Sequence, residues 1–446
     1  FGIGHPRSRT GAARERRLGL GTRRATRVDT VVSRTVSLTI DTIAAGGDGV
    51  ARNEGLVVFV PRTAPGDVIT ASVSGKGHFA RGSLRTILRP SASRIEAACP
   101  HYTRERCGGC QIQHMRYAAQ LDAKQRIITA AMARVGKRGI TPPEVVPSAD
   151  EWRYRAKLTL AMRRRSGGWV AGLHPYDDPG RVFALADCPI TDGRVVAAWR
   201  ELLHASEFFP DATSLRGSVR WTDDGSTFVL IGAHRWSDHA RFFDAVPTLA
   251  ALYWEPDGAP RKLLGDRRLR ATPAASFAQV NPVVAAVLRE HVLGVVRSFG
   301  PSSVIDAYSG AGDLAVNLAS TGISVVAIEL DRDAARWAEQ RLAPPSRSIV
   351  GRVEEVLPRL APADVVVVNP PRSGLHADVS EALVEMPDIR AIVYVSCDPA
   401  TLARDVARLS GFAIQSIRAF DMFPQTSHVE TVCVLTPARS TGNATS

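Results

Sequence analysis

The chain has 446 residues, of which 45% are hydrophobic, as expected for a globular protein with two or three domains. It contains no run of about 18 apolar residues and no secretory signal pattern, so we expect a cytoplasmic protein without a membrane span. The net charge of +12 favours a nucleic acid as partner, although a solvated arginine-rich surface gives the same charge. No pattern indicates an obligate protein partner.

Residues 1–30 carry much of this charge. They contain eight arginines but only two acidic residues. Such a segment cannot bury enough apolar surface to fold alone, so we predict a disordered basic tail over residues 1–30. An RNA-binding arm is the functional alternative.

Residues 31–90 alternate short β-branched runs with Gly- and Pro-rich turns. The runs are VSLTI, GLVVFVP and VITASVSG, and the turns between them are AAGGDGVA and TAPGD. This pattern predicts a small antiparallel, OB-like β-barrel. Barrels of this kind bind nucleic acid through a basic strand face and loops, so RNA is the expected ligand of this unit.

Residues 91–270 have a mixed pattern that predicts a central α+β domain. A helix is expected over Gln111–Val135, and GSVRWT with STFVLIGAH predicts a β-hairpin. The segment holds four of the six cysteines, namely Cys99, Cys107, Cys110 and Cys188. Without a secretion signal, metal or cluster ligation is favoured over disulfides, and four thiolates suit either a [4Fe–4S] cluster or tetrahedral zinc.

Residues 271–440 alternate β-branched runs with helical segments. The runs are SVIDAYS, VVAIEL, ADVVVVN, AIVYVSC and VCVLTP. The alternation predicts a Rossmann-like, doubly wound α/β domain with a parallel sheet. A helix is expected to begin near Pro282, directly after the polar segment FAQVN.

The first motif of this domain is a glycine-rich turn between a strand and a helix, DAYSGAGD from Asp306 to Asp313. Gly310 and Gly312 let the backbone approach a ligand, and Glu329 ends the next strand, where a carboxylate can accept ribose hydroxyls. The combination resembles the S-adenosylmethionine site of class I methyltransferases. A nucleotide site and a purely structural turn are the alternatives.

Three further motifs stand at strand ends. NPPRSG places Asn369 after a strand, YVSCDP places Cys397 in a loop, and SHVE carries Glu430 into the last strand. A thiolate at such a position is a candidate nucleophile, and a strand-end acid is a candidate general base. The plain alternatives are a buried core cysteine, an exposed acid and a strand terminated by its two prolines.

Together these motifs resemble the S-adenosylmethionine-dependent RNA uracil-5 methyltransferase family, of the type with a TRAM domain and an iron–sulfur cluster. YVSCDP and DMFPQTSHVE carry the resemblance most specifically, while GGDGVAR, VVFVP and APGD resemble a TRAM domain. The resemblance implies methylation of carbon 5 of a uridine, with ribosomal RNA slightly favoured over tRNA. Two alternatives stay open: an amino-methyltransferase acting on adenine or protein, suggested by NPP, and an RNA-binding protein with a decayed methyltransferase domain.

The resemblance also implies a role for each site residue by matching position. Cys397 would be the nucleophile and Glu430 the general base. The residues that would bind S-adenosylmethionine are Gln279, Tyr308, Gly310, Gly312, Glu329 and Asn369, the last of which stands where the family usually has Asp. The [4Fe–4S] cluster would be ligated by Cys99, Cys107, Cys110 and Cys188.

Overall fold

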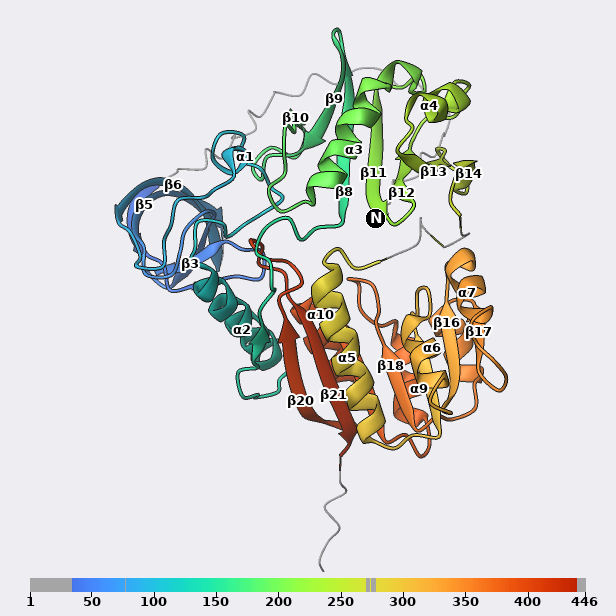
Figure 1. The fold of residues 1–446 in the computed structure, drawn as a ribbon. Coiled ribbons are helices and arrows are strands. Elements are labelled where there is room, and N and C mark those ends of the chain that lie inside the picture. Colours follow the sequence, from blue (N-terminus) through green and yellow to red (C-terminus); the bar gives the residue numbers. More distant parts are fainter. Residues whose placement is uncertain (1–33, 77, 270–272, 274–277, 439–446) are drawn as a thin grey trace, which may run out of the picture.

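The structure, a computed structural model, describes residues 34–76, 78–269, 273 and 278–438. Three sheets divide these residues into an N-terminal, a central and a C-terminal unit (Figure 1). The predicted basic tail over residues 1–30 lies outside the described residues. Within the described part of the chain, no helix is both long enough and apolar enough to cross a membrane.

The N-terminal unit is a six-stranded sheet that curls around a small apolar core (Figure 1). Its strands, in spatial order, are β1 (Arg34–Thr39), β5 (Val68–Lys76), β6 (Phe79–Arg89), β4 (Leu56–Val60), β3 (Gly49–Asn53) and β2 (Thr42–Ile43). Leu38, Val58 and Ile69 are among the buried side chains that form this core. The expected antiparallel pairing is wrong for β4 and β6, which are parallel because β5 separates them in the chain.

The central unit is a seven-stranded sheet covered on one face by α3 (Gly193–His204). The strands, in spatial order, are β10 (Phe183–Ala184), β9 (Gly168–Leu173), β8 (Lys157–Arg165), β11 (Ser214–Thr222), β12 (Gly225–Ile231), β13 (Leu249–Glu255) and β14 (Lys262–Asp266). Trp199 of α3 packs against Phe228 in the core between helix and sheet. The predicted hairpin is confirmed as β11 and β12. Two short helices, α1 (Pro100–Thr103) and α4 (His239–Ala245), complete the unit.

The helix predicted over Gln111–Val135 is wrong at its start. The structure places α2 at Tyr117–Arg134, six residues later. The backbone N–H groups of Gln111 and Ile112 both donate to the carbonyl of Gln425, each at 3.2 Å. This tertiary contact holds the segment before α2 out of a helix, because those N–H groups are bound to a distant part of the chain.

The C-terminal unit is an eight-stranded sheet between two layers of helices. Its strands, in spatial order, are β17 (Arg347–Val350), β16 (Ser324–Glu329), β15 (Ser303–Ala307), β18 (Val365–Val368), β19 (Ala391–Ser396), β21 (Glu430–Pro437), β20 (Phe412–Phe420) and β7 (Val145–Val146). The prediction of a parallel sheet is correct for β17 to β19 but wrong for β21, which runs antiparallel to β19 and β20. A short connection joins β20 directly to β21, so β21 returns antiparallel.

Helices cover both faces of this sheet (Figure 1). One face packs against α5 (Pro282–Ser298) and α6 (Asp313–Ala319). The other packs against α2, α8 (Val353–Val356), α9 (Ala377–Glu385) and α10 (Pro399–Arg408). The remaining helix, α7 (Arg332–Glu339), lies beside β16 and β17. Although α2 and β7 precede the central sheet in the chain, both are part of this C-terminal unit.

Candidate active site

The glycine-rich turn after β15 has the backbone geometry of a ligand-binding loop. Tyr308, Gly310 and Gly312 all have positive φ angles, of 62°, 57° and 77°. A Cβ atom at Gly312 would lie 2.5 Å from the Cβ of Ala338, so α7 packs directly against this glycine. A Cβ atom at Gly310 would meet nothing within 4 Å, which leaves open space beside the turn. The turn therefore presents bare backbone to a ligand, as a cofactor loop requires.

Glu329 ends β16 and is held against this turn. One of its carboxylate oxygens accepts a hydrogen bond from the N–H of Gly310 at 2.8 Å, and the other accepts from the N–H of Asp331 at 2.7 Å. A carboxylate oxygen has a second lone pair, so both oxygens keep the capacity to accept a ligand hydroxyl. The structure thus brings Glu329 and Gly310 together as predicted.

Asp306 is an acidic residue of this turn to which the sequence reasoning gave no role of its own. It is buried at the end of β15, and its Oδ2 atom has no hydrogen-bond partner in the structure. Burial raises the pKa of Asp306 to about 7, and the nearby charges of Glu329 and Asp313 act in the same direction. The signal was present in the sequence, because a charged residue inside the apolar strand SVIDA needs a functional or structural reason.

Cys397 and Glu430 lie across from each other at the ends of adjacent strands. Ser396, the last residue of β19, pairs with Thr431 of β21 in antiparallel register. The next pair in this register is Cys397 with Glu430, so the two side chains start from neighbouring backbone positions. Cys397 is half-buried and Glu430 is fully buried, with its Oε2 atom unpaired.

The electrostatics of this pair depend on a third residue, Arg372. Burial and the negative charge of Glu430 raise the pKa of Cys397 to about 11, while the charge of Arg372 and a hydrogen bond from it act to lower that pKa. Burial raises the pKa of Glu430 to about 8, again opposed by Arg372. The sequence reasoning identified NPPR but assigned Arg372 no place at the nucleophile, because β18 and β19 meet only in the folded sheet.

Asn369 and Gln279 lie at the same end of the C-terminal sheet. Asn369 follows β18, and its backbone N–H donates to the carbonyl of Ala307 at the end of β15. Gln279 is half-buried just before α5, whose first turn is capped by Asn281. The predicted helix start near Pro282 is confirmed. Phe277, which opens the FAQVN segment, lies outside the described residues.

The segment between β20 and β21, from Asp421 to Val429, contacts all three units of the molecule, and we call it the junction loop. Gln425 of this loop exchanges two hydrogen bonds with Gln120 of α2, each at 2.9 Å. The buried side chain of Lys124, also on α2, forms an ion pair with Asp421. Ser427 donates to the carbonyl of Ala45 in the N-terminal unit at 2.8 Å.

The junction loop also contacts the cysteine segment, through the bonds from Gln111 and Ile112 to Gln425. Tyr154 adds a hydrogen bond from its hydroxyl to the carbonyl of Pro424 at 3.0 Å. Most of the DMFPQTSHVE motif therefore forms structural contacts, and Glu430 is the part that enters the site.

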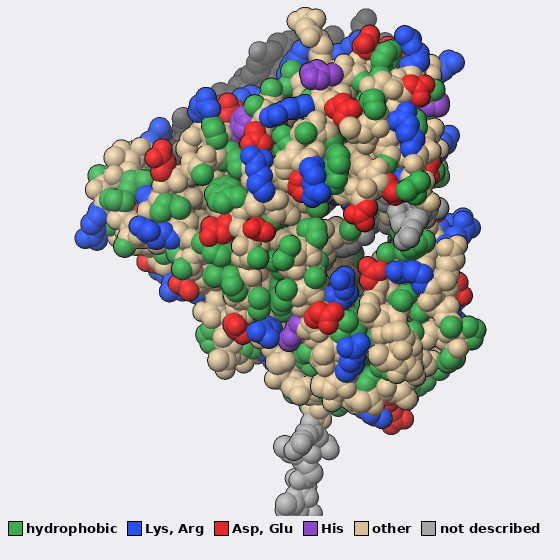
Figure 2. Space-filling view, viewed as in Figure 1, with side chains coloured by type: hydrophobic (Ala, Val, Ile, Leu, Met, Phe, Trp, Pro, Cys, Tyr) green, Lys and Arg blue, Asp and Glu red, His purple; other side chains and the backbone are tan. Residues whose placement is uncertain are grey.

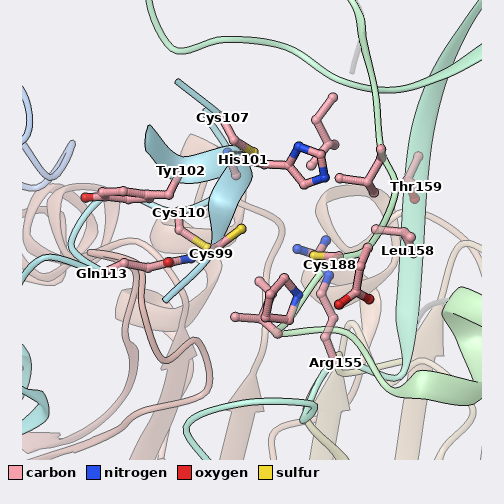
Figure 3. Close-up of a pocket in the computed structure, with 16 residues that line it drawn as sticks. Cys99, His101, Tyr102, Cys107, Cys110, Gln113, Arg155, Leu158, Thr159 and Cys188 are labelled. Atoms are coloured by element: carbon pink, nitrogen blue, oxygen red, sulfur yellow. Dashed lines mark hydrogen bonds between the residues drawn. The ribbon is translucent and has the colours of Figure 1, made fainter. Parts of the chain in front are cut away.

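The four predicted ligand cysteines line one cavity of about 50 Å³ (Figure 3). Cys99, Cys107 and Cys110 are buried, and Cys188 reaches the cavity from a separate segment of the central unit. Burial, together with the proximity of the other thiols, raises the pKa of Cys107 to about 11 and that of Cys110 to about 12. Among the described residues, no group of three or more His, Cys, Asp or Glu side chains is arranged as a ready metal site.

The family model described as tRNA (Uracil-5-)-methyltransferase matches residues 347–438, which include β18, β19 and β21. An uncharacterized RNA methyltransferase of Halalkalibacterium halodurans is 31% identical over 90% of this chain and 96% of its own length. Another from Gloeobacter violaceus is 34% identical over 91% of this chain and 97% of its own length.

A solved structure has a similar fold over nearly the whole chain. It is the tRNA (uracil-54, C5)-methyltransferase of Pyrococcus abyssi in complex with S-adenosyl-L-homocysteine. The two chains are 24% identical, the TM-score is 0.67, and the match covers 90% of this chain and all of that one. The similarity extends beyond the C-terminal sheet, so the arrangement of several units is shared.

Proposed function

This chain belongs to the RNA (uracil-5-)-methyltransferase family, and from this premise we propose that it methylates carbon 5 of a uridine in RNA through a covalent bond between Cys397 and carbon 6. The observation that carries the proposal is the pairing of a cysteine with a buried, unpaired carboxylate at the ends of β19 and β21. Such a pair supplies a nucleophile and a base at one place.

The proposed methyl donor is S-adenosylmethionine, bound at the turn after β15. Support comes from the open space at Gly310, the unpaired buried oxygen of Asp306 and the strand-end carboxylate of Glu329. Tyr308, Gly312, Gln279 and Asn369 complete the proposed cofactor site. The archaeal structure of similar fold, which holds S-adenosyl-L-homocysteine, is consistent with this assignment.

The proposed chemistry makes carbon 5 nucleophilic before it is methylated. The Cys397 thiolate adds its electron pair to carbon 6, and the electrons of the 5,6 double bond move onto carbon 5 and the adjoining carbonyl. Carbon 5 then takes the methyl group that S-adenosylmethionine would supply; the methyl–sulfur bond breaks, its electron pair stays on sulfur, and S-adenosyl-L-homocysteine leaves. Glu430 removes the proton that carbon 5 still carries, the double bond reforms, and the sulfur leaves carbon 6 with its electron pair.

Arg372 has a supporting place in this scheme. A thiol with a pKa of about 11 is largely protonated at neutral pH, so the reactive thiolate needs stabilisation. The guanidinium of Arg372 supplies positive charge beside both Cys397 and Glu430. It thereby favours the ionised forms of nucleophile and base.

The identity of the RNA is a separate part of the proposal. The cysteine cluster with the TRAM-like unit favours ribosomal RNA, whereas the family model and the Pyrococcus abyssi enzyme carry tRNA in their names. Mapping 5-methyluridine in ribosomal RNA and tRNA from cells with and without the gene decides between them.

We also propose that Cys99, Cys107, Cys110 and Cys188 ligate a [4Fe–4S] cluster. The four cysteines line one cavity, and four thiolates suit either a tetrahedral zinc ion or a [4Fe–4S] cluster. The resemblance to family members that hold such a cluster favours the iron–sulfur centre. Protein purified without oxygen should contain iron and sulfide. Stoichiometric zinc without iron would show that the four cysteines bind zinc and not a cluster.

The covalent step is tested with Cys397→Ala and Glu430→Gln. Cys397→Ala should lose both methylation and the protein–RNA adduct, because carbon 5 is then not activated. Glu430→Gln should still form the adduct and accept the methyl group, but resolve it about 10²–10⁴-fold more slowly, as expected for loss of a general base.

The readout for both variants is a methylated protein–RNA band on a denaturing gel. Cys433→Ala, which removes a buried thiol elsewhere in β21, is the matched control and should behave as the wild type. Methylation of uridine by Cys397→Ala at a rate near that of the wild type would favour direct transfer without a covalent bond.

A further inference from the structure

A buried carboxylate on α10 has no place in the proposed chemistry, although it lies close to the motifs that meet at the thiol. Asp405 is fully buried, and it stands on the helix that begins two residues after Cys397. Taking a carboxylate out of water is costly unless other groups pair with it. The partners of Asp405 therefore indicate which parts of the fold it holds together.

The two oxygens of Asp405 have different kinds of partner. Oδ2 accepts a hydrogen bond from the hydroxyl of Tyr394 in β19 and another from the backbone N–H of Leu375, each at 2.8 Å. Oδ1 forms ion pairs with Arg404 at 2.8 Å and with Arg408 at 3.5 Å. Two arginines of its own helix thus balance the charge, whereas Oδ2 binds the sheet and the segment after β18.

The segment after β18, residues 369–374 with the sequence NPPRSG, is held against α10, and we call it the NPPRSG loop. Arg404 donates to the carbonyl of Ser373 at 2.7 Å, and Asp405 binds the N–H of Leu375, directly after the loop. Gly374 has a positive φ of 77°, and a Cβ atom there would collide with the carboxylate of Asp405. The glycine therefore lets the loop approach α10 this closely.

The same carboxylate joins the two elements on either side of Cys397. Tyr394 is fully buried in β19, three residues before the cysteine. Asp398 caps α10 directly after the cysteine, because its side chain accepts from the N–H groups of Ala400 and Thr401 at 2.9 and 3.0 Å. The strand before Cys397, the helix after it and the NPPRSG loop thus all meet at Asp405.

Arg372 of the NPPRSG loop needs such support because its own side chain is exposed. An exposed arginine has many rotamers, and holding it in one place costs conformational entropy. Burial and the charges of Glu430 and Asp398 raise the pKa of Cys397, whereas Arg372 acts to lower it through its charge and a hydrogen bond. Both effects weaken with distance, so they depend on where the loop backbone places Arg372.

We propose that Asp405 is a positioning residue that, together with Arg404, fixes the NPPRSG loop so that the guanidinium of Arg372 stays beside the sulfur of Cys397. The inference rests on the proposed function for the reason that a thiolate is needed, but its test uses neither RNA nor S-adenosylmethionine. A carboxylate with only a structural role would stabilise the fold without changing the thiol.

The test measures how fast iodoacetamide alkylates Cys397 in the full chain as the pH is raised, by mass spectrometry of the peptide that carries it. Only the thiolate reacts, so the rate reports the ionised fraction. Asp405→Asn removes the charge at nearly constant size, and Arg404→Gln removes the bond to Ser373 from a half-buried side chain. Each should slow alkylation near neutral pH about three- to tenfold, since a tenfold change corresponds to about one pKa unit.

A double variant shows whether the effect passes through Arg372. Arg372→Gln should slow alkylation by itself. Arg372→Gln with Arg404→Gln should be no slower than Arg372→Gln alone, because residues that act through one another are not additive. Since Arg404→Gln changes a half-buried side chain, this comparison remains available if Asp405→Asn does not fold.

Asp364→Asn is the matched control. Asp364 accepts hydrogen bonds from the N–H and the hydroxyl of Ser302, each at 2.7 Å, and pairs with Arg390 at 3.1 Å. It precedes β18, whereas the NPPRSG loop follows that strand, so it stands at the other end. This control should lose stability in urea and keep the alkylation rate of the wild type. Wild-type alkylation in Arg404→Gln, equal slowing in Asp364→Asn, or a double variant slower than Arg372→Gln would overturn the positioning role.

The test separates this inference from the proposed function. Alkylation that depends on Arg404 through Arg372 in a protein that methylates no uridine would support the positioning role and refute the proposed reaction. Uridine methylation through Cys397 in a protein whose alkylation ignores Arg404 would do the reverse.

Discussion

Glu430 is fully buried with one oxygen unpaired, and it lies across from Cys397. Since burial raises its pKa to about 8 and that of Cys397 to about 11, both groups are mainly protonated at neutral pH. The rate of methylation at low substrate should therefore rise with pH through about pH 8, because the base and the nucleophile gain their active forms in the same direction.

Arg372 should set the pH range over which the methylation rate rises. Arg372→Gln removes the cation that lowers both pKa values, so this rising limb of the pH–rate profile should move to higher pH. Arg372→Lys keeps a positive charge, so its rising limb should stay close to that of the wild type. Initial rates between about pH 6.5 and 9.5 measure the limb. An identical profile in Arg372→Gln would show that this guanidinium does not act on the pair.

The same burial predicts a gain in stability when the acid is removed. The pKa of Glu430 is raised from 4.5 to about 8 on folding, so between these values the folded state holds a proton that the unfolded state has lost. The contribution of Glu430 to the free energy of unfolding is thus fully present below about pH 4.5, and it is lost as the pH rises to about 8. Glu430→Gln should be more stable than the wild type at pH 8, by a few kcal/mol at about 1.4 kcal/mol per pKa unit.

Urea denaturation of the two proteins at several pH values measures this difference. The difference in unfolding free energy between Glu430→Gln and the wild type should be small near pH 5 and grow toward pH 8. A constant gap would mean that the substitution acts through packing rather than through ionisation.

Among the elements, the junction loop depends most on one buried ion pair. Lys124 of α2 and Asp421 are both fully buried, and Lys124 also donates to the carbonyl of Phe423 at 3.0 Å. Lys124→Met leaves the carboxylate of Asp421 buried without its cation, which should cost about 3–5 kcal/mol of unfolding free energy. The double substitution Lys124→Met with Asp421→Leu removes both charges and should recover most of the loss, as thermal or urea unfolding would show. A double variant as unstable as the single one would mean that packing, not charge, dominates.

The elements also show what the sequence could predict. The buried strands β15, β18 and β19 are recognisable because both of their faces are apolar, so they appear as unbroken runs such as VVVV. The strand β20, FAIQSIRAF, is largely exposed on one side and has a mixed sequence, and it was missed. The start of α2 was misplaced because Gln111 and Ile112 bind a residue more than 300 positions away, which no local pattern reveals.

The candidate site was predictable to a similar degree. Strand-end motifs singled out Cys397 and Glu329, which follow or end parallel strands, where functional side chains of such sheets gather, and Glu430, which begins the antiparallel strand β21 at the same edge. Arg372 beside the thiol, the unpaired oxygen of Asp306 and the role of Gln425 depend on the order of strands and on packing between units. Those properties come from the fold as a whole.

At the scale of the whole molecule, the cysteine cavity and the end of the C-terminal sheet that holds Cys397 and Glu430 are joined through the junction loop. Figure 2 shows the near face hollowed where the central and C-terminal units meet. Cys110 is followed directly by the two residues that donate to Gln425, and Tyr154 packs with Cys99 and Cys110 while bonding Pro424. Loss of the proposed cluster should therefore loosen the junction loop, which leads directly into Glu430 at the start of β21.

Cys188→Ser tests this coupling. The variant should lose iron, and the amide of Gln425 should exchange with solvent about tenfold faster, which corresponds to about 1.4 kcal/mol of local stability. Hydrogen–deuterium exchange with mass spectrometry of peptides covering residues 421–430 measures this, and Cys433→Ala serves as the control that keeps the iron. Unchanged exchange in an iron-free variant would show that the cavity and the loop are independent.

The junction loop has a further consequence for synthesis on the ribosome. Gln120 and Lys124 are separated from their partners by 305 and 297 positions. At a translation rate of about 5–20 residues per second, α2 waits roughly 15–60 s before the loop that receives it is made. The N-terminal sheet and the cysteine segment wait longer, since they precede α2. Until the hairpin of β20 and β21 leaves the exit tunnel, the N-terminal sheet, the cysteine segment and α2 therefore lack the junction-loop contacts that join them. A translational pause before that point leaves all the surfaces that later form these contacts exposed at the same time.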